Sequence, residues 1–169
     1  MKHLKNLLLT TAIILACSFS AQAQSKVAHI NTQELVDSMP EMKSAKSELE
    51  KLAKTYETDI QAMATELQNK IKQYDAESST KTDEENAKRL QEVQSMEQSI
   101  RQYQAQAQQD LQKKELDLLR PITEKAKDAI LKVGNAQGFD YILDSSPGQG
   151  VIMANGKDLL SDVKSELGF

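Results

Sequence analysis

PEMKSAKSELEKLAKTYETDIQAMATELQNKIKQY (40–74) and DEENAKRLQEVQSMEQSIRQYQAQAQQDLQKKELDLLR (83–120) are the stretches that decide the fold of this chain. Glycine is absent from both, and the only proline is Pro40 at the start of the first. Ala, Leu, Glu, Lys, Gln and Met, which favour helix strongly, fill most positions. The sequence therefore predicts two long helices joined by a short polar break at 75–82.

Apolar residues mark one face of each predicted helix. In the first helix they recur every three or four residues, which is the spacing of a single helix face. The 34 residues of 41–74 would span roughly 50 Å at the helical rise per residue. We expect an antiparallel coiled-coil hairpin, the arm, covering 40–120. Its apolar seam includes Leu49, Leu52, Tyr56, Ile60, Met63, Leu67, Ile100 and Tyr103.

Folding the chain at about Ser79 predicts which residues of the two helices face each other. Tyr56 then lies near Tyr103, Met63 near Met96, and Met42 near Leu116. On the return helix the same periodicity begins the seam at Ala87 and Leu90, and polar residues interrupt it further along. The outer faces of both helices are polar and would stay in water.

The two ends of the chain are expected to meet in a small body, 24–39 and 121–169. Residues 26–31 read as a strand, and a short helix capped by Asn31 follows to about Ser38. Pro121 interrupts a helical pattern that continues beyond it, so we expect a kink there and not a helix end. Gly134 and Gly138 are expected to end that helix.

After this helix the pattern predicts two strands, 139–144 and 151–154, and a final helix over 158–167. The predicted fold class is α+β, mostly α, with the arm inserted into a small sheet. Such a body buries little apolar area, and open sheet edges invite pairing with another chain. We therefore expect an oligomer whose interface includes Val27, Ile30, Tyr141, Leu143 and Ile152.

Residues 1–23 have the features of a cleaved signal peptide. Lys2 and Lys5 precede a short apolar run, and Ala21 and Ala23 form a small-x-small cleavage site. An alternative is a lipoprotein anchored through Cys17, the only cysteine of the chain. Either route predicts export. Removing two lysines leaves 19 basic and 25 acidic residues, a net charge of −6, which argues against nucleic acid as a partner.

The sequence offers little catalytic or metal-binding chemistry. His29 is the only histidine after the signal segment, and a general base or a metal site usually needs partners. Asp140 and Asp144 have strand spacing, and we expect them to accept hydrogen bonds at a turn or interface. The hypothesis is a protein that is not an enzyme and has no cofactor and no metal.

Three short segments, KVAHIN (26–31), GFDYILD (138–144) and VIMA (151–154), flank or follow the predicted hairpin. In this order the chain resembles the Skp/OmpH family of periplasmic chaperones. The resemblance implies a jellyfish-shaped homotrimer that holds unfolded outer-membrane proteins between its arms without ATP. Flexible methionine side chains suit such adaptable contacts; the candidates are Met39, Met42, Met63 and Met96.

The charge of the arm departs from the family pattern. The best-known members are basic, whereas 41–118 holds 12 basic and 16 acidic residues, a net charge of −4. A lipopolysaccharide site or a membrane surface is therefore not expected as a partner. An alternative function for the same architecture is a structural spacer or scaffold of the cell envelope.

Overall fold

The computed structural model describes residues 25–169. The predicted signal peptide, its cleavage site and Cys17 lie outside these residues. In chain order the elements are β1 (Val27–Ile30), α2 (Thr32–Ser38), α3 (Pro40–Glu77), the 3-10 turn η1 (Ser78–Thr80), α4 (Asp83–Ala136), β2 (Tyr141–Asp144), β3 (Lys157–Asp158) and α5 (Leu160–Leu167). The prediction of an α+β, mostly helical chain with a small sheet is confirmed.

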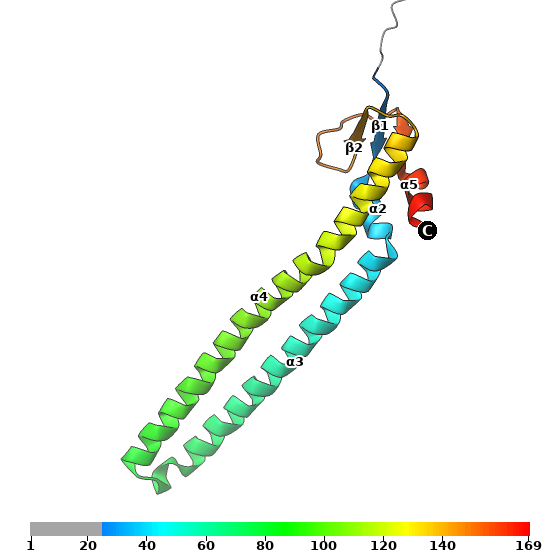
Figure 1. Cartoon of the computed structure of the whole chain (residues 1–169). Helices are drawn as coiled ribbons and strands as arrows, with labels where there is room; N and C mark the ends of the chain where they lie inside the picture. Colours follow the sequence, from blue (N-terminus) through cyan, green and yellow to red (C-terminus); the bar gives the residue numbers. More distant parts are fainter. Residues whose placement is uncertain (1–24) are drawn as a thin grey trace, which may run out of the picture.

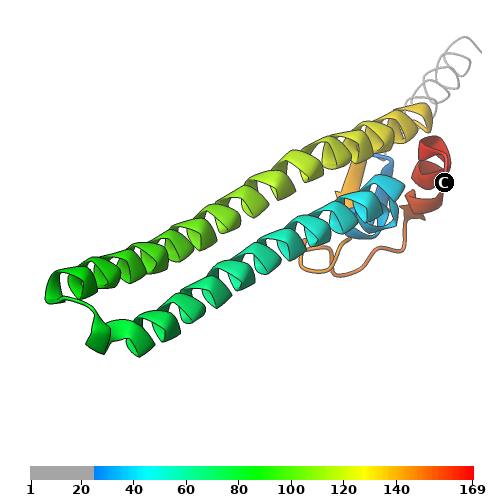
Figure 2. The same cartoon turned by 90° about the horizontal axis from the view of Figure 1, so that it is seen from below.

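Helices α3 and α4 run side by side and project far from the rest of the molecule (Figures 1 and 2). Pro40 occupies the first turn of α3, where a main-chain N–H would have no acceptor within the helix, so its absence costs no hydrogen bond. Thr82 and Glu85 cap α4 reciprocally, the Thr82 side chain accepting from the Glu85 N–H and the Glu85 side chain from the Thr82 N–H. No helix within 25–169 has the length and apolar content to cross a membrane.

The sheet joins the two ends of the chain, as the sequence predicts. Its strand order is β2-β1-β3, and β1 pairs in parallel with both neighbours. Val27 lies opposite Tyr141 and His29 opposite Leu143. The whole arm is therefore the connection between two adjacent parallel strands.

The hydrophobic core lies in the body, under one face of the sheet. Ala28 and Ile30 of β1 pack there with residues of α2 and of the end of α4. Leu35, Met39, Leu159 and Val163 are essentially inaccessible to solvent. The arm contributes only Ala45 to this cluster from α3, so the core ends where the arm begins.

Three predictions about the body are wrong. Residues 151–154 form no strand; instead Lys157 and Asp158 pair with β1 as β3. Helix α5 begins at Leu160, where the Asp158 carboxylate accepts the Leu160 N–H. Gly134 does not end α4 but lies buried inside it. A glycine is needed there because a Cβ at this position would lie 2.3 Å from the Ile142 Cδ1 atom.

Helix α4 continues through Pro121 to Ala136. The proline therefore does not stop the helix, although it removes one main-chain donor from it. The next residue, Ile122, is buried in the core of the body. Pro121 thus lies where the arm joins the body, and the kink expected there remains a prediction. Gly138, with φ of +70°, makes the turn from α4 toward β2.

Candidate functional site

Two surfaces of the described chain are candidates for function: the arm and the open face of the sheet. Along the arm, the predicted seam residues of α3 lie half-buried at regular spacing. Only Ala45 and Ala107 are fully buried along this seam. The arm is therefore a thin pair of helices with much side-chain surface left to solvent. The half-buried seam residues are Leu49, Leu52, Tyr56, Ile60, Met63, Leu67, Ile100 and Tyr103.

A pair of tyrosines sets the register of the two helices halfway along the arm. The rings of Tyr56 and Tyr103 meet edge to face, as the folding point predicts. The Tyr56 hydroxyl donates to Asp110 at 2.9 Å, and the Tyr103 hydroxyl donates to Asp59 at 2.7 Å. Hydrogen bonding to these carboxylates raises the pKa of both tyrosines. Each helix thus gives one phenol and one carboxylate to the contact.

Between this contact and the tip of the arm, the two helices leave a hollow of about 410 Å³. Met63, Met96 and Ile100 line it together with the polar side chains of Glu66 and Ser99. The predicted proximity of Met63 and Met96 agrees with their sharing this hollow. Methionine side chains adapt to neighbours of different shape, so this hollow is a candidate contact site on the arm.

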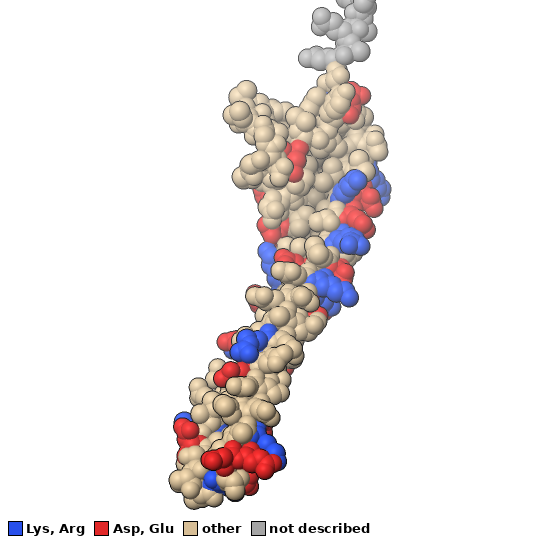
Figure 3. Space-filling model, turned by 90° about the vertical axis from the view of Figure 1, so that its left-hand side faces the viewer, with Lys and Arg blue, Asp and Glu red and all other residues tan. Residues whose placement is uncertain are grey.

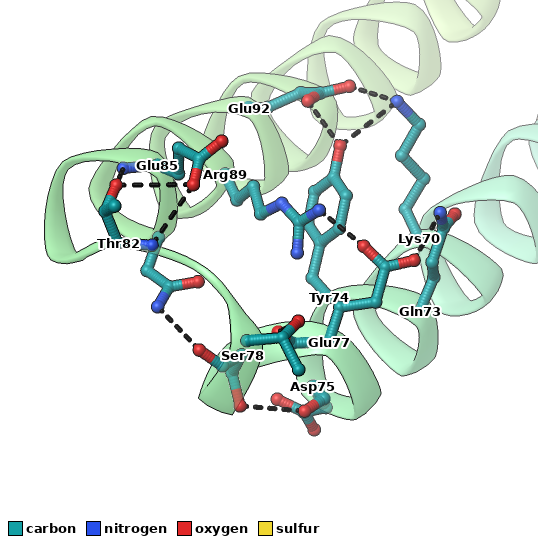
Figure 4. A network of polar contacts seen from close by, with 12 residues as sticks. Lys70, Gln73, Tyr74, Asp75, Glu77, Ser78, Thr82, Glu85, Arg89 and Glu92 are labelled. Carbon is teal, nitrogen blue, oxygen red and sulfur yellow. Dashed lines mark hydrogen bonds and ion pairs between the residues drawn. The ribbon is translucent and has the colours of Figure 1, made fainter.

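Polar side chains hold the tip of the arm together (Figure 4). The Tyr74 hydroxyl donates to Glu92, and Lys70 forms an ion pair with the same carboxylate. The Arg89 guanidinium lies 4.6 Å from the centre of the Tyr74 ring and pairs with Glu77 at 2.5 Å. This arrangement joins α3 to α4 by charge and hydrogen bonds where few apolar contacts exist.

The hydrogen bonds at the tip change the ionisation of its carboxyl groups. Hydrogen bonds from Gln73 and Arg89 lower the pKa of Glu77. Hydrogen bonds from Lys70 and Tyr74 lower the pKa of Glu92 and, reciprocally, Glu92 raises the pKa of Lys70. The shifts favour the charged forms of Glu77, Glu92 and Lys70, so the tip is a compact network of opposite charges joined by the neutral side chains of Gln73 and Tyr74.

The sequence prediction of the seam is wrong near the tip and near the body. Ala87 and Leu90 are exposed, and Asn86 and Arg89 face inward in their place. Met42 packs against the core of the body, whereas Leu116 is 63% exposed, so these two do not pair. The error at the tip arises because apolar spacing alone cannot reveal that Arg89 stacks on Tyr74 across the arm.

The second candidate surface is the open face of the sheet. Register places Val27 beside Tyr141, and both side chains are exposed, as is Leu143. Ile152, on the loop after β2, is 101% exposed. These four predicted interface residues are therefore accessible. Ile30 is not: it points to the opposite face and is 1% exposed in the chain's own core, which excludes it from an interface.

The other predicted residues have structural positions in the body. The Asp140 carboxylate accepts the Lys26 N–H at 2.8 Å. Burial opposes ionisation of Asp144, but hydrogen bonds from Ser146 and Thr32 outweigh it and lower its pKa. The His29 ring lies 3.2 Å from the Ser145 hydroxyl. Met39 is wholly buried, which removes it from the candidate contact residues.

Comparison with known proteins places this architecture in a family. Residues 26–167 match the family model described as outer membrane protein (OmpH-like). The chain belongs to this family. A solved OmpH-like chain from Caulobacter crescentus superposes with a TM-score of 0.77 at 20% identity, covering 87% of this chain and 86% of the other. At this identity the likeness concerns the fold alone.

Curated relatives share the family over nearly their whole length. The chaperone protein Skp of Pectobacterium atrosepticum is 25% identical over 155 residues, covering 92% of this chain and 93% of that protein. Skp of Photorhabdus luminescens is 28% identical over 134 residues, covering 79% and 81%. Skp of Escherichia coli is 25% identical over 164 residues, covering 97% and 99%. These relatives are named as chaperones and not as enzymes.

Proposed function

We propose that this chain is an ATP-independent holdase chaperone of the periplasm. In this proposal it binds unfolded outer-membrane proteins between its arms and prevents their aggregation. The family membership and the chaperone names of the relatives support the proposal. The observation that carries it is the arm itself, formed by α3 and by the part of α4 before Pro121, which extends away from a body with a small core.

The surface of the arm suits a client that has no fixed shape. Leu90 and Leu116 are exposed, and the hollow on the arm is lined in part by the unbranched side chains of Met63 and Met96. Such sites offer many weak apolar contacts instead of one deep pocket. An unfolded β-barrel chain carries alternate apolar residues along every strand, so it could use several of these contacts at once.

We further propose that three copies assemble through their bodies. The three-stranded sheet contains 10 residues (4, 4 and 2), and its open face exposes Val27, Tyr141 and Leu143. The core covers the other face of this sheet, so the exposed apolar side chains of the open face are the ones that a partner could cover. Assembly would cover that face and place the arms around a common space.

The acidic arm makes lipopolysaccharide or a membrane surface an unsuitable partner. Acidic and basic side chains alternate in small groups along the side of the arm seen in Figure 3, with no extended basic area. Anionic headgroups are attracted by clusters of basic residues. Apolar contact is therefore the proposed basis of client binding.

The test is the aggregation of a urea-unfolded outer-membrane β-barrel protein after dilution, followed by light scattering without nucleotide. The proposal expects scattering to be suppressed at about one trimer per client. A spacer or scaffold of the envelope, the alternative function, would leave aggregation unchanged, and that result would reject the chaperone proposal.

A further inference from the structure

The three tyrosines of the arm make the same kind of contact between its helices. Each phenol hydroxyl donates a hydrogen bond to a carboxylate on the opposite helix. The pairs are Tyr56 with Asp110, Tyr103 with Asp59, and Tyr74 with Glu92. A phenol suits such a position because its ring packs on apolar neighbours while its hydroxyl reaches a polar group at the edge. The third pair is drawn in Figure 4.

One level of the arm lacks such a contact. From Asp59, seven residues or about two helical turns along α3 lead to Glu66. The same step back along α4 from Tyr103 leads to Met96. Four residues further on each helix, toward the tip, an ion pair joins α3 to α4 again. At the level between these two contacts, Glu66 therefore stands opposite a methionine, which has no hydroxyl to donate.

The Glu66 carboxylate is an acceptor without a donor from the protein. Within residues 25–169 it takes part in neither a hydrogen bond nor an ion pair, and it lies exposed at the edge of the hollow. Two serines also line the hollow, but the Ser99 hydroxyl donates to the Ser95 carbonyl of its own helix. A partner that covers this carboxylate must therefore bring its own donor, because an unpaired acceptor is costly to remove from water.

The space beside Glu66 is large enough for an aromatic ring. The hollow has a volume of about 410 Å³, and the half-buried side chains of Met63, Met96 and Ile100 form its apolar lining. For comparison, a cavity of about 150 Å³ with an apolar lining binds benzene. Methionine sulfur makes favourable contacts with the edges of aromatic rings. The hollow thus provides the apolar part of a phenol site, and Glu66 provides the polar part.

We propose that this hollow binds a tyrosine side chain of the unfolded client, with the phenol hydroxyl donating to Glu66 and the ring packed on Met63 and Met96. This inference rests on the proposed function and names the client side chain that the site takes. Outer-membrane β-barrels supply such side chains, because girdles of aromatic residues flank the apolar band of their strands. The arm then holds a client by the same contact that joins its own helices.

Other client side chains fit this hollow less well. A lysine could pair with Glu66, but packing its charge against Met63 and Met96 removes water from it at a cost. A client carboxylate is repelled by Glu66. An aliphatic side chain displaces water from the carboxylate without replacing its hydrogen bonds. A phenol is a neutral donor attached to an apolar ring, so it satisfies both parts of the site.

The first experiment measures which side chain enters the hollow. The chain beginning at residue 24, with isotope-labelled methionine methyl groups, is titrated by NMR with short soluble peptides that alternate valine with serine. The peptides differ only in one central residue, which is tyrosine, phenylalanine, leucine or lysine. The tyrosine peptide should bind about tenfold more tightly than the leucine peptide. Its ring current should shift the methyl signals of Met63 and Met96, whereas Met39, which is wholly buried in the body, should not respond.

The second experiment removes the acceptor. In Glu66→Ala the tyrosine peptide should lose its advantage and bind no more tightly than the phenylalanine peptide, because only the hydroxyl distinguishes the two. Glu50, also exposed on α3 but outside the hollow, provides the matched control. Glu50→Ala removes the same charge from the arm and should leave the preference for tyrosine unchanged.

The third experiment fills the hollow from within. The phenol introduced by Met96→Tyr stands opposite Glu66 in the register that Tyr103 has with Asp59, so it should occupy the hollow and donate to Glu66. Its pKa should lie above 10.0, as the pKa values of Tyr56 and Tyr103 do. Adding Glu66→Ala should return that pKa toward 10.0. The filled hollow should no longer bind the tyrosine peptide.

The outcomes separate this inference from the proposed function. Equal binding of the tyrosine and leucine peptides, or tightest binding of the lysine peptide, shows that the assigned occupant is wrong, whether or not the chain holds a client. A preference for tyrosine that survives Glu66→Ala, or methyl signals of Met63 and Met96 that respond to no peptide, also overturns the inference. A parent chain that fails to suppress client aggregation rejects the proposed function, whereas the peptide titrations would still establish the phenol site.

Discussion

The rings of Tyr56 and Tyr103 meet edge to face across the arm, with centroids 5.7 Å apart and planes at 65°. Their hydroxyl groups donate in opposite directions, to Asp110 and Asp59. This pair fixes the register of α3 against α4 at mid-arm, where buried apolar area is small. Because each hydroxyl donates to a carboxylate of the other helix, removing a carboxylate should alter the ionisation of its tyrosine.

Replacing Asp110 should change the titration of Tyr56, to which it is hydrogen-bonded, more than that of Tyr103, on which it acts only through its charge. The folded pKa of Tyr56 is raised above its ordinary value of 10.0, first by its hydrogen bond to Asp110. Its contribution to stability is therefore present below pH 10.0 and is lost as the pH rises through the folded value. In Asp110→Ala the Tyr56 pKa should fall, measured by NMR of labelled tyrosine rings. An unchanged Tyr56 titration would show that the hydrogen bond does not form.

Ala107 should tolerate no larger side chain. It is 4% exposed in the arm seam, so Ala107→Leu must push the helices apart, at a cost of about 1–3 kcal/mol in unfolding free energy. Ala105, two residues away and exposed, is the matched control. Ala105→Leu should change the unfolding free energy by less than about 0.5 kcal/mol. Equal effects in urea unfolding would argue against close helix packing at this level.

Gly134 should not tolerate a side chain, because Ile142, which is distant in the sequence, packs closely against it. A Cβ at this position would approach the Ile142 Cδ1 atom to 2.3 Å. We expect Gly134→Val to lower the unfolding free energy by about 1–3 kcal/mol through overpacking of the body. Ala105→Val should cost only the lower helix propensity of valine, roughly 0.5 kcal/mol. A stabilised Gly134→Val chain would contradict the observed contact of α4 with β2.

The tip of the arm should loosen in acid before the body does. The folded pKa values of Glu77 and Glu92 lie below their ordinary value of 4.5. Their contribution is therefore present above pH 4.5 and is lost as the pH falls through the lower folded values. Hydrogen exchange, corrected for its intrinsic pH dependence, should become faster at η1 than in β1 over this interval. Equal acceleration in both would count against a tip held by charge.

Sequence patterns could predict the parts of the fold that depend on local periodicity. Helix propensity and the spacing from Leu49 to Leu67 predict the long first helix, and Thr82 or Asp83, followed by Glu84 and Glu85, predicts the start of the return helix. The contact of Tyr56 with Tyr103 follows from the folding point. These features depend on neighbours in the sequence or on simple geometry along two helices.

The remaining features depend on contacts between distant residues. Gly134 resembles a helix terminator, but it lies inside α4, and its lack of a side chain lets Ile142 pack against the helix. Arg89 resembles a solvated residue, but it stacks on Tyr74. The segment 151–154 has strand composition and no partner within its own copy. Residue type indicates which secondary structure or environment a position favours, whereas contacts with distant residues decide which one it adopts.

The most direct measurement of the central claim is client holding by a chain with a shortened arm. Deleting 57–102 and inserting a Gly-Ser turn joins α3 to α4 where Tyr56 and Tyr103 already meet, and leaves the body untouched. The account predicts that the shortened chain keeps its assembled mass but no longer suppresses aggregation of an unfolded outer-membrane protein. A shortened chain that keeps the client soluble as well as the full-length chain does would contradict it.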